Sequence, residues 1–122
     1  MIIDTTDKKC EVVFSNDANI DRIKWRWRKD TGTELLKNID KLLKKRRKKL
    51  ESIKAILVNQ GPGSYTGTRV GITIANTLGW SLNIPVIGYS GKDFRRFVSQ
   101  VSRKLSKNKL PKNHFPTPIY EK

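Results

Sequence analysis

The chain has 122 residues, which is enough for one small domain around a single lean core. Its 26 lysines and arginines outnumber 11 aspartates and glutamates, so nucleic acid, an acidic protein or an anionic membrane are all admissible partners, although a basic proteome would give the same composition. Cys10 is the single cysteine, which excludes a disulfide framework and favours a buried structural thiol. No apolar run reaches the roughly 20 residues of a membrane span, so we expect a cytoplasmic protein without membrane contact.

Three short antiparallel strands are predicted at the amino-terminal end. Apolar stretches at residues 2–3 and 11–14 are separated by a turn at residues 7–9, and in a third strand Ile23, Trp25 and Trp27 alternate with lysine and arginine. The shared face of the two tryptophans favours packing in the core or at an interface. The basic residues between them leave base stacking open as an alternative.

A helix over residues 31–54 is predicted next. Thr31 and Glu34 are spaced as a capping box, and leucines and an isoleucine recur at helical period after them. The second half of this helix carries a run of six basic residues, which puts positive charge on every side except a leucine stripe. Both a solvated helix end, favoured by its own dipole, and a nucleic-acid contact are compatible with this run. The run consists of Lys44, Lys45, Arg46, Arg47, Lys48 and Lys49.

The remaining segments predict an α/β fold. Residues 55–58 and 85–89 are expected to form buried strands, with a helix over residues 66–82 between them. Joined to the three antiparallel strands by right-handed crossovers, they build a mixed five-stranded sheet, the ribonuclease-H-like half of an actin-type fold. Residues 92–107 predict a basic amphipathic helix that could cover either the sheet or the open side of the helix over residues 66–82. We therefore expect a single lobe over residues 1–107 and an irregular tail over residues 108–122.

A glycine-rich loop at residues 61–71 is the most specific motif of the chain. A loop between a strand and a helix can cradle a phosphate. The candidate residues for such a cradle are Asp4, Thr5, Gly61, Gly63 and Ser64. The spacing matches neither a Walker loop, since the loop contains no lysine, nor a dinucleotide fingerprint, since residue 66 is threonine. The alternative is a tight turn that lets the helix pack closely on the sheet.

The sequence offers no catalytic constellation. It holds one histidine, one cysteine and no metal-ligand spacing. Asp4 lies at a strand end, where ribonuclease-H-like nucleases and actin-like ATPases hold a metal, but a nuclease needs several converging acids. The later strands end in Asn59 and Ser90 instead. We therefore expect no enzyme activity from the chain alone, no metal and no required cofactor.

The predicted helix over residues 66–82 has two uncharged faces. Small residues recur every four positions along one of them, at Gly67, Gly71, Ala75 and Gly79. The opposite face also lacks charge, and a helix with so little polar surface is normally covered on both sides. Because one lobe offers only its sheet, we expect another chain to cover the second side. Arginine at Gly71 or Ala75 is then expected to block that partner while the free chain still folds.

The glycine loop and the segments that follow it, at residues 72–79 and 83–90, resemble the signature of the TsaB (YeaZ) family. Residues 3–6 and 10–13 resemble the family's first two strands. Members belong to the actin-like, ribonuclease-H-like superfamily and act as the non-catalytic partner of TsaD in making threonylcarbamoyladenosine at position 37 of tRNA. At 122 residues the chain resembles a short form that lacks most of the C-terminal lobe.

The resemblance implies that the two helices bind a TsaD-like protein. It further implies a TsaE-like ATPase and tRNA in the same assembly, with ATP held through the partners. The uncharged helix also allows a homodimer when no partner is present. A stand-alone basic nucleic-acid-binding module and a degenerate nucleotide binder are the alternative functions. The expected partner interface comprises Leu36, Ile39, Leu43, Gly67, Val70, Gly71, Ile74, Ala75 and Leu78.

Overall fold

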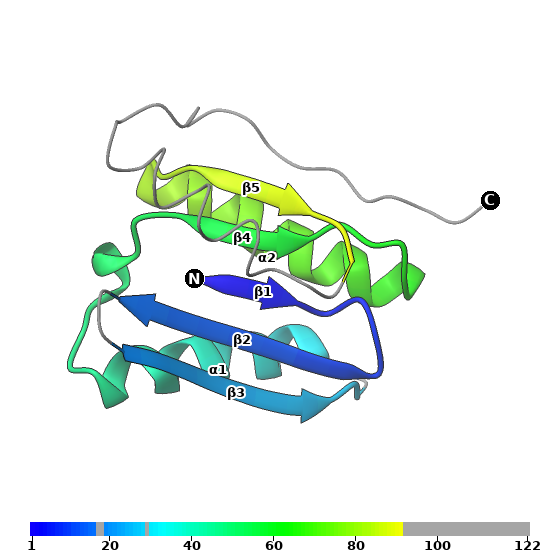
Figure 1. Ribbon diagram of the computed structural model, residues 1–122, viewed down its shortest axis with the longest axis horizontal. Helices are drawn as coiled ribbons and strands as arrows, with labels where there is room; N and C mark the ends of the chain where they lie inside the picture. The colour runs from blue at the N-terminus through cyan, green and yellow to red at the C-terminus, as the bar shows by residue number, and fades with distance from the viewer. Residues whose placement is uncertain (17–18, 29, 92–122) are drawn as a thin grey trace.

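The computed structural model describes residues 1–16, 19–28 and 30–91. These residues form one sheet with two α-helices on the same side of it, behind the sheet in Figure 1. The strands are β1 (Ile2–Asp4), β2 (Lys9–Asn16), β3 (Asn19–Arg26), β4 (Ile56–Asn59) and β5 (Val86–Tyr89). The helices are α1 (Thr31–Lys45), the short 3-10 helix η1 (Leu50–Ser52) and α2 (Tyr65–Leu82).

The sheet is mixed and has the strand order β3-β2-β1-β4-β5. Strand β1 pairs antiparallel with β2 and parallel with β4, and β5 runs parallel to β4. The predicted mixed five-stranded α/β sheet is therefore confirmed. Strand β2 starts at Lys9, two residues earlier than the apolar run alone indicates, so the predicted turn is confined to Asp7 and Lys8.

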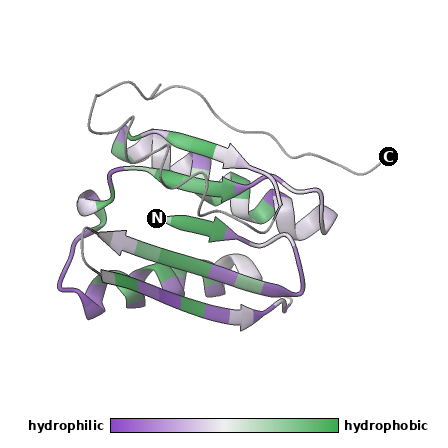
Figure 2. Ribbon diagram, in the orientation of Figure 1, coloured by the Kyte–Doolittle hydropathy of each residue, from purple (hydrophilic) through white to green (hydrophobic). Residues whose placement is uncertain are grey.

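The main core lies between the sheet and the two helices. Alternate residues of β2, namely Cys10, Val12 and Phe14, are buried. Val12 and Phe14 pack in this core with Leu35 of α1 and Ala75 of α2. Figure 2 shows the apolar residues concentrated along the strands. Burial raises the pKa of the Cys10 thiol to about 11, as befits a structural cysteine.

A smaller apolar cluster lies on the opposite face of the sheet. It comprises Ile2, Val13, Ala55, Leu57 and Tyr89. The helix predicted over residues 92–107, which was expected to cover the sheet, and the tail over residues 108–122 lie outside the described residues. The proposed lobe boundary at residue 107 therefore stays a prediction.

Helix α1 differs from its prediction at both ends. The capping box is wrong: the cap residue is Asp30, without a side-chain hydrogen bond, and the Thr31 hydroxyl instead donates to the Arg28 carbonyl at 2.8 Å. The helix ends at Lys45 and not near Lys54. Arg47 takes the left-handed conformation with φ 54°, and its amide donates to the Lys44 carbonyl at 3.0 Å, closing a Schellman-type end. Arg46 and Arg47 form a turn, and Lys48 and Lys49 lie in irregular chain beyond it.

Helix α2 matches its prediction within one residue. Ser64 caps its first turn, because the Ser64 hydroxyl oxygen accepts a hydrogen bond from the Gly67 amide at 3.2 Å. At the other end Asn83 adopts a left-handed conformation with φ 54°, a common way to stop a helix. Ser64 and Asn83 thus fix both ends of the segment that connects β4 to β5.

The amino terminus itself gives a testable prediction. The Met1 amine donates to the Ala55 carbonyl at 3.0 Å, and its burial lowers its pKa from 8.0 to about 5. Between these two values the unfolded chain binds a proton that the native chain does not, so the free energy of unfolding should fall as pH is lowered from 8 to 5. Urea denaturation at several pH values between 5 and 8 measures this free energy of unfolding. The control carries His114→Gln, which removes the only histidine of the chain, because histidine side chains ordinarily titrate in this pH range. A flat profile in the control would contradict the burial of the amine.

Candidate functional site

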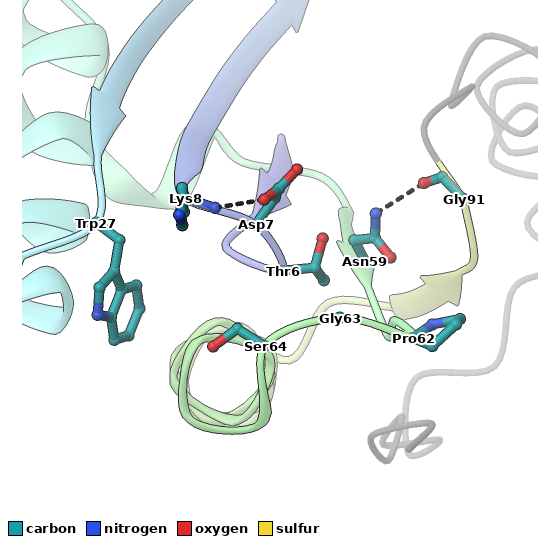
Figure 3. Close-up of a pocket in the computed structure, with 9 residues that line it drawn as sticks. All are labelled: Thr6, Asp7, Lys8, Trp27, Asn59, Pro62, Gly63, Ser64 and Gly91. Carbon is teal, nitrogen blue, oxygen red and sulfur yellow. Dashed lines mark hydrogen bonds between the residues drawn. The ribbon is translucent and has the colours of Figure 1, made fainter. Parts of the chain in front are cut away.

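A cavity opens at the carboxyl ends of the parallel strands, where α/β sheets place ligands. Its volume is about 690 Å³, and it lies between the glycine loop and the turn after β1 (Figure 3). Trp27, just after β3, and Lys8 flank it on one side, and Asn59 on the other. The full lining is Thr6, Asp7, Lys8, Trp27, Asn59, Pro62, Gly63, Ser64 and Gly91.

Asp4, the residue most suited to a metal, is held by the chain itself. One carboxylate oxygen accepts hydrogen bonds from the Thr6 amide at 3.0 Å and the Thr6 hydroxyl at 2.7 Å. The other accepts from Asn59 Nδ2 at 3.1 Å. Within residues 1–16, 19–28 and 30–91, no group of three or more histidines, cysteines or acids could hold a metal ion. The Asp4 carboxylate therefore organises the strand ends.

Asn59 joins three segments through one buried amide. Its Nδ2 also donates to the Gly91 carbonyl at 2.7 Å, and its Oδ1 accepts from the Gly61 amide at 2.9 Å. The side chain therefore ties β1, the glycine loop and the residue that follows β5 together. Sequence reasoning noted Asn59 only as a missing acid. The sequence signal that could have identified this role is an asparagine at the end of a strand, directly before a glycine-rich loop.

In the glycine loop the amides of Gly61 and Ser64 form hydrogen bonds within the chain. Gly61 needs its glycine because its φ is 94°, and the Ser64 amide donates to the Thr6 carbonyl at 2.7 Å. A Cβ at Gly63 would lie 2.8 Å from the Thr6 Cβ, closer than real Cβ atoms approach, and would also overlap the Thr6 carbonyl. This geometry favours the tight-turn interpretation over the phosphate cradle.

The small-residue stripe of α2 faces the sheet. A Cβ at Gly67 would overlap the Thr5 carbonyl, and one at Gly71 would overlap the Thr5 hydroxyl. Ala75 has no exposed surface. The Thr5 hydroxyl also donates to the Gly67 carbonyl, so the residue directly after β1 is hydrogen-bonded to the backbone of α2. The glycines therefore serve the packing of helix on sheet.

This placement bears on the predicted partner interface, which stays a prediction. Five of its nine residues are buried in the chain's own core, where other parts of the chain already cover them. They are Ile39, Leu43, Gly67, Gly71 and Ala75. For the same reason we now expect arginine at Gly71 or Ala75 to disrupt the fold of the free chain, and not to leave it folded as the sequence alone suggested.

The other four predicted residues, Leu36, Val70, Ile74 and Leu78, remain at least partly accessible. Leu36 is 50% exposed, and Val70 and Ile74 line a groove of about 420 Å³. Ile74 and Leu78 also pack partly against the core. Gly32 of α1 approaches this groove, since a Cβ there would lie 3.6 Å from Val70 Cγ1 and 3.9 Å from Ile74 Cδ1. The two helices thus meet beside the groove.

Beside the groove, α2 has a row of exposed residues that the sequence analysis did not identify. We call this row the outer face of α2; it consists of Thr66, Arg69, Thr73, Thr77 and Trp80. Trp80 is 74% exposed, and Tyr65, in the first turn, is 60% exposed and stacks with the Arg69 guanidinium, 5.2 Å from the ring centroid. Helical periodicity counted from the glycine stripe would have found these positions.

The basic run at the end of α1 is partly neutralised. Lys44 Nζ lies 2.8 Å from Asp40 Oδ2, and Lys45 Nζ lies 3.3 Å from Asp21 Oδ1. Arg46 bonds the other oxygen of Asp21, and this hydrogen bond lowers the pKa of that carboxyl. The salt bridges of the described residues leave only Arg47, Lys48 and Lys49 of this run without a carboxylate partner.

Comparison with known proteins shows what this arrangement is similar to. Residues 29–91, just over half of the chain, match the family model of TsaD, tRNA N6-adenosine threonylcarbamoyltransferase. The tRNA threonylcarbamoyladenosine biosynthesis protein TsaB of Escherichia coli is 31% identical over 90 residues, which cover 74% of this chain and 39% of that protein. TsaB of Bacillus subtilis is 52% identical over 40 residues, 33% of this chain and 18% of that protein. The chain belongs to the TsaB (YeaZ) family.

A solved structure confirms the fold of this TsaB-family chain. YeaZ from Pseudomonas aeruginosa superposes with a TM-score of 0.70 at 24% identity, covering 86% of this chain and 48% of that one. The ribonuclease-H-like fold is therefore shown. The TsaB-family chain spans less than half the length of the relatives it matches. Of its described helices, none is both long and apolar enough to cross a bilayer.

Proposed function

We propose that this chain is a cytoplasmic, non-catalytic subunit that binds a TsaD-like protein in the assembly making threonylcarbamoyladenosine at position 37 of tRNA. Family membership supports the pathway, and the match of residues 29–91 of this chain to the TsaD family model supports an association with a TsaD-like protein. The observation that carries the binding role is the outer face of α2, an exposed helical surface with one charged residue, Arg69.

The outer face and the adjacent Tyr65 supply three residues of the kind that anchor a binding surface. Trp80, Tyr65 and Arg69 are of the residue types that dominate binding energy in protein interfaces. The groove lined by Val70 and Ile74 gives a partner side chain an apolar place to insert. An accessory role also fits the strand ends, where Asp4 and its neighbours are engaged in hydrogen bonds within the chain.

The other expected partners are a second copy of this chain, a TsaE-like ATPase and ATP. We propose that a second copy of this chain occupies the outer face when no TsaD-like protein is present, since both would bury the same apolar groups. A TsaE-like ATPase and ATP belong, in this proposal, to the assembled complex. The loop at residues 61–67 contains no lysine to bind a terminal phosphate, which favours ATP held through the partners.

A charge in the middle of the outer face tests the proposal. Thr73→Arg places a guanidinium at an exposed position that lines the groove, so the free chain should keep its fold. Burying this unpaired charge should weaken binding of the TsaD-like protein at least about 30-fold, as for a hot-spot loss of about 2 kcal/mol. Calorimetric titration of the purified partner measures it.

The matched control is Thr33→Arg, the same substitution at an exposed position of α1. Its affinity for the partner should stay within about threefold of the parent chain, as for a surface change worth under about 0.5 kcal/mol. Equal affinity for both variants and the parent would show that the partner binds elsewhere.

A further inference from the structure

The face of the β2–β3 hairpin that points away from the helices is a basic surface. Strand alternation and register place four side chains there, because Lys9 pairs with Arg26, Glu11 with Lys24, and Val13 with Arg22. Their neighbours Cys10, Val12 and Phe14 are buried. We call the exposed residues Lys9, Arg22, Lys24 and Arg26 the basic sheet face.

Folding alone does not explain this arrangement. Lys9 and Arg26 lie directly opposite each other, and like charges at such positions destabilise a sheet. Glu11 is the one acid on this face, and it bridges to Arg22 at 3.5 Å. The face therefore keeps an excess of three positive charges over a short stretch of two strands, unlike the run at the end of α1, where Asp21 and Asp40 pair with three of the six cations.

We propose that the basic sheet face binds the phosphate backbone of RNA. Alternate side chains on a strand are about 6.7 Å apart, so the three cations of β3 form a regular row that can follow a sugar–phosphate chain. The choice of RNA rests on the proposed function, in which the assembly acts on tRNA. Among the residues that the structure describes, both α-helices lie on the other side of the sheet, so a partner bound to α2 and RNA bound to this face would occupy opposite sides (Figure 1).

The composition of the face favours RNA over an acidic protein. Protein interfaces are built around apolar and aromatic anchors and are depleted in lysine at their centre. Here the exposed positions of β2 and β3 on this face are basic or small, and Ile20, at the far end of β3, is the one large apolar residue that is strongly exposed. Surfaces that bind phosphates without reading bases have this composition.

The experiment removes four charges from each of two surfaces and measures binding of a labelled tRNA transcript as a function of salt. The test variant carries Lys9→Gln, Arg22→Gln, Lys24→Gln and Arg26→Gln. The control variant carries Lys41→Gln, Arg47→Gln, Lys48→Gln and Lys49→Gln, all at exposed positions at or near the end of α1. Both variants lose the same net charge, so an effect of overall charge is equal in the two.

The test variant should bind tRNA at least about tenfold more weakly near 0.1 M salt, and its slope of log affinity against log salt should flatten by about 3, at 0.7 to 0.9 per lost phosphate contact. The control should keep most of the parent slope. Equal losses in both variants, or no loss in the test variant, would overturn the proposal. Competition by polyglutamate as strong as by unlabelled tRNA would overturn it in favour of an acidic protein partner.

Two further measurements distinguish loss of RNA binding from loss of partner binding and from a folding defect. Affinity of the test variant for the TsaD-like protein should be unchanged, so a failure of the proposed partner binding shows itself in that titration and not in the RNA assay. Arg26→Gln alone should flatten the slope by about 0.7 to 0.9, which a folding defect would not produce.

Discussion

Replacing Gly71 with arginine is expected to unfold the chain. A side chain at this position must overlap the Thr5 hydroxyl, and Gly71 lies on the buried side of α2. Overpacking costs about 1–3 kcal/mol, and a buried charge without a partner adds several more. The sum is comparable to the roughly 5–15 kcal/mol that stabilise a small domain. Circular dichroism and urea denaturation of the purified variant measure the loss.

The comparison that makes this result specific is with Thr73→Arg, two residues further along the same helix. Both variants introduce the same charge into α2, but Thr73 is exposed and Gly71 is buried. We expect a native-like denaturation curve for Thr73→Arg only. If Gly71→Arg folds normally, then the stripe of small residues does not pack on β1, and the orientation of α2 is wrong.

Replacing Asn59 with alanine should cost about 2–4 kcal/mol of folding free energy. The change removes three hydrogen bonds at a side chain that is 3% exposed, and it leaves the Gly61 amide and one oxygen of Asp4 without their partner. Hydrogen exchange of the Gly61 amide should accelerate together with the loss in stability. Chemical denaturation and exchange measured on one sample give both quantities.

Asn59→Asp is the matched variant, because it keeps the size and the oxygen that accepts from Gly61 but replaces the Nδ2 donor with a carboxylate oxygen. It brings a second carboxylate to the oxygen of Asp4 that Asn59 Nδ2 contacts at 3.1 Å, so the folded pair holds a proton more tightly than the unfolded chain. Relative to the parent chain, the stability of this variant should therefore be greatest at low pH and fall as pH rises. Stability that is insensitive to either substitution would show that the Asn59 network does not fasten the loop.

Local sequence signals predicted most of the fold. The apolar runs of β4 and β5 are short and bounded by polar, proline or glycine residues, so their type and place follow from neighbouring residues alone. The same holds for α2, whose cap Ser64 lies directly after the glycine loop. The order of the elements along the chain, joined by right-handed crossovers, predicted the mixed sheet, whereas the strand order β3-β2-β1-β4-β5 comes from the structure.

Features that depend on distant contacts were not predictable in the same way. A stripe of glycines signals close approach, but only the position of Thr5 under α2 shows that the approaching surface is the sheet. The end of α1 was missed because Arg47 takes the left-handed conformation that glycine usually supplies. The basic sheet face needs the pairing of Lys9 with Arg26, which no single strand reveals.

The position of β1 in the middle of the sheet bears on how the chain acquires its structure. Ile2 pairs with Val13 on one side and with Leu57 on the other, so the first strand has a nearby neighbour and a very distant one. The hairpins of β1, β2 and β3 can assemble as soon as they are synthesised, whereas the parallel half must wait until β4 has been made. During that interval one edge of β1 stays open to any extended segment. Closing the long connection is therefore the slow, topology-limited step, and the interval is when the nascent chain most needs protection from pairing with another copy.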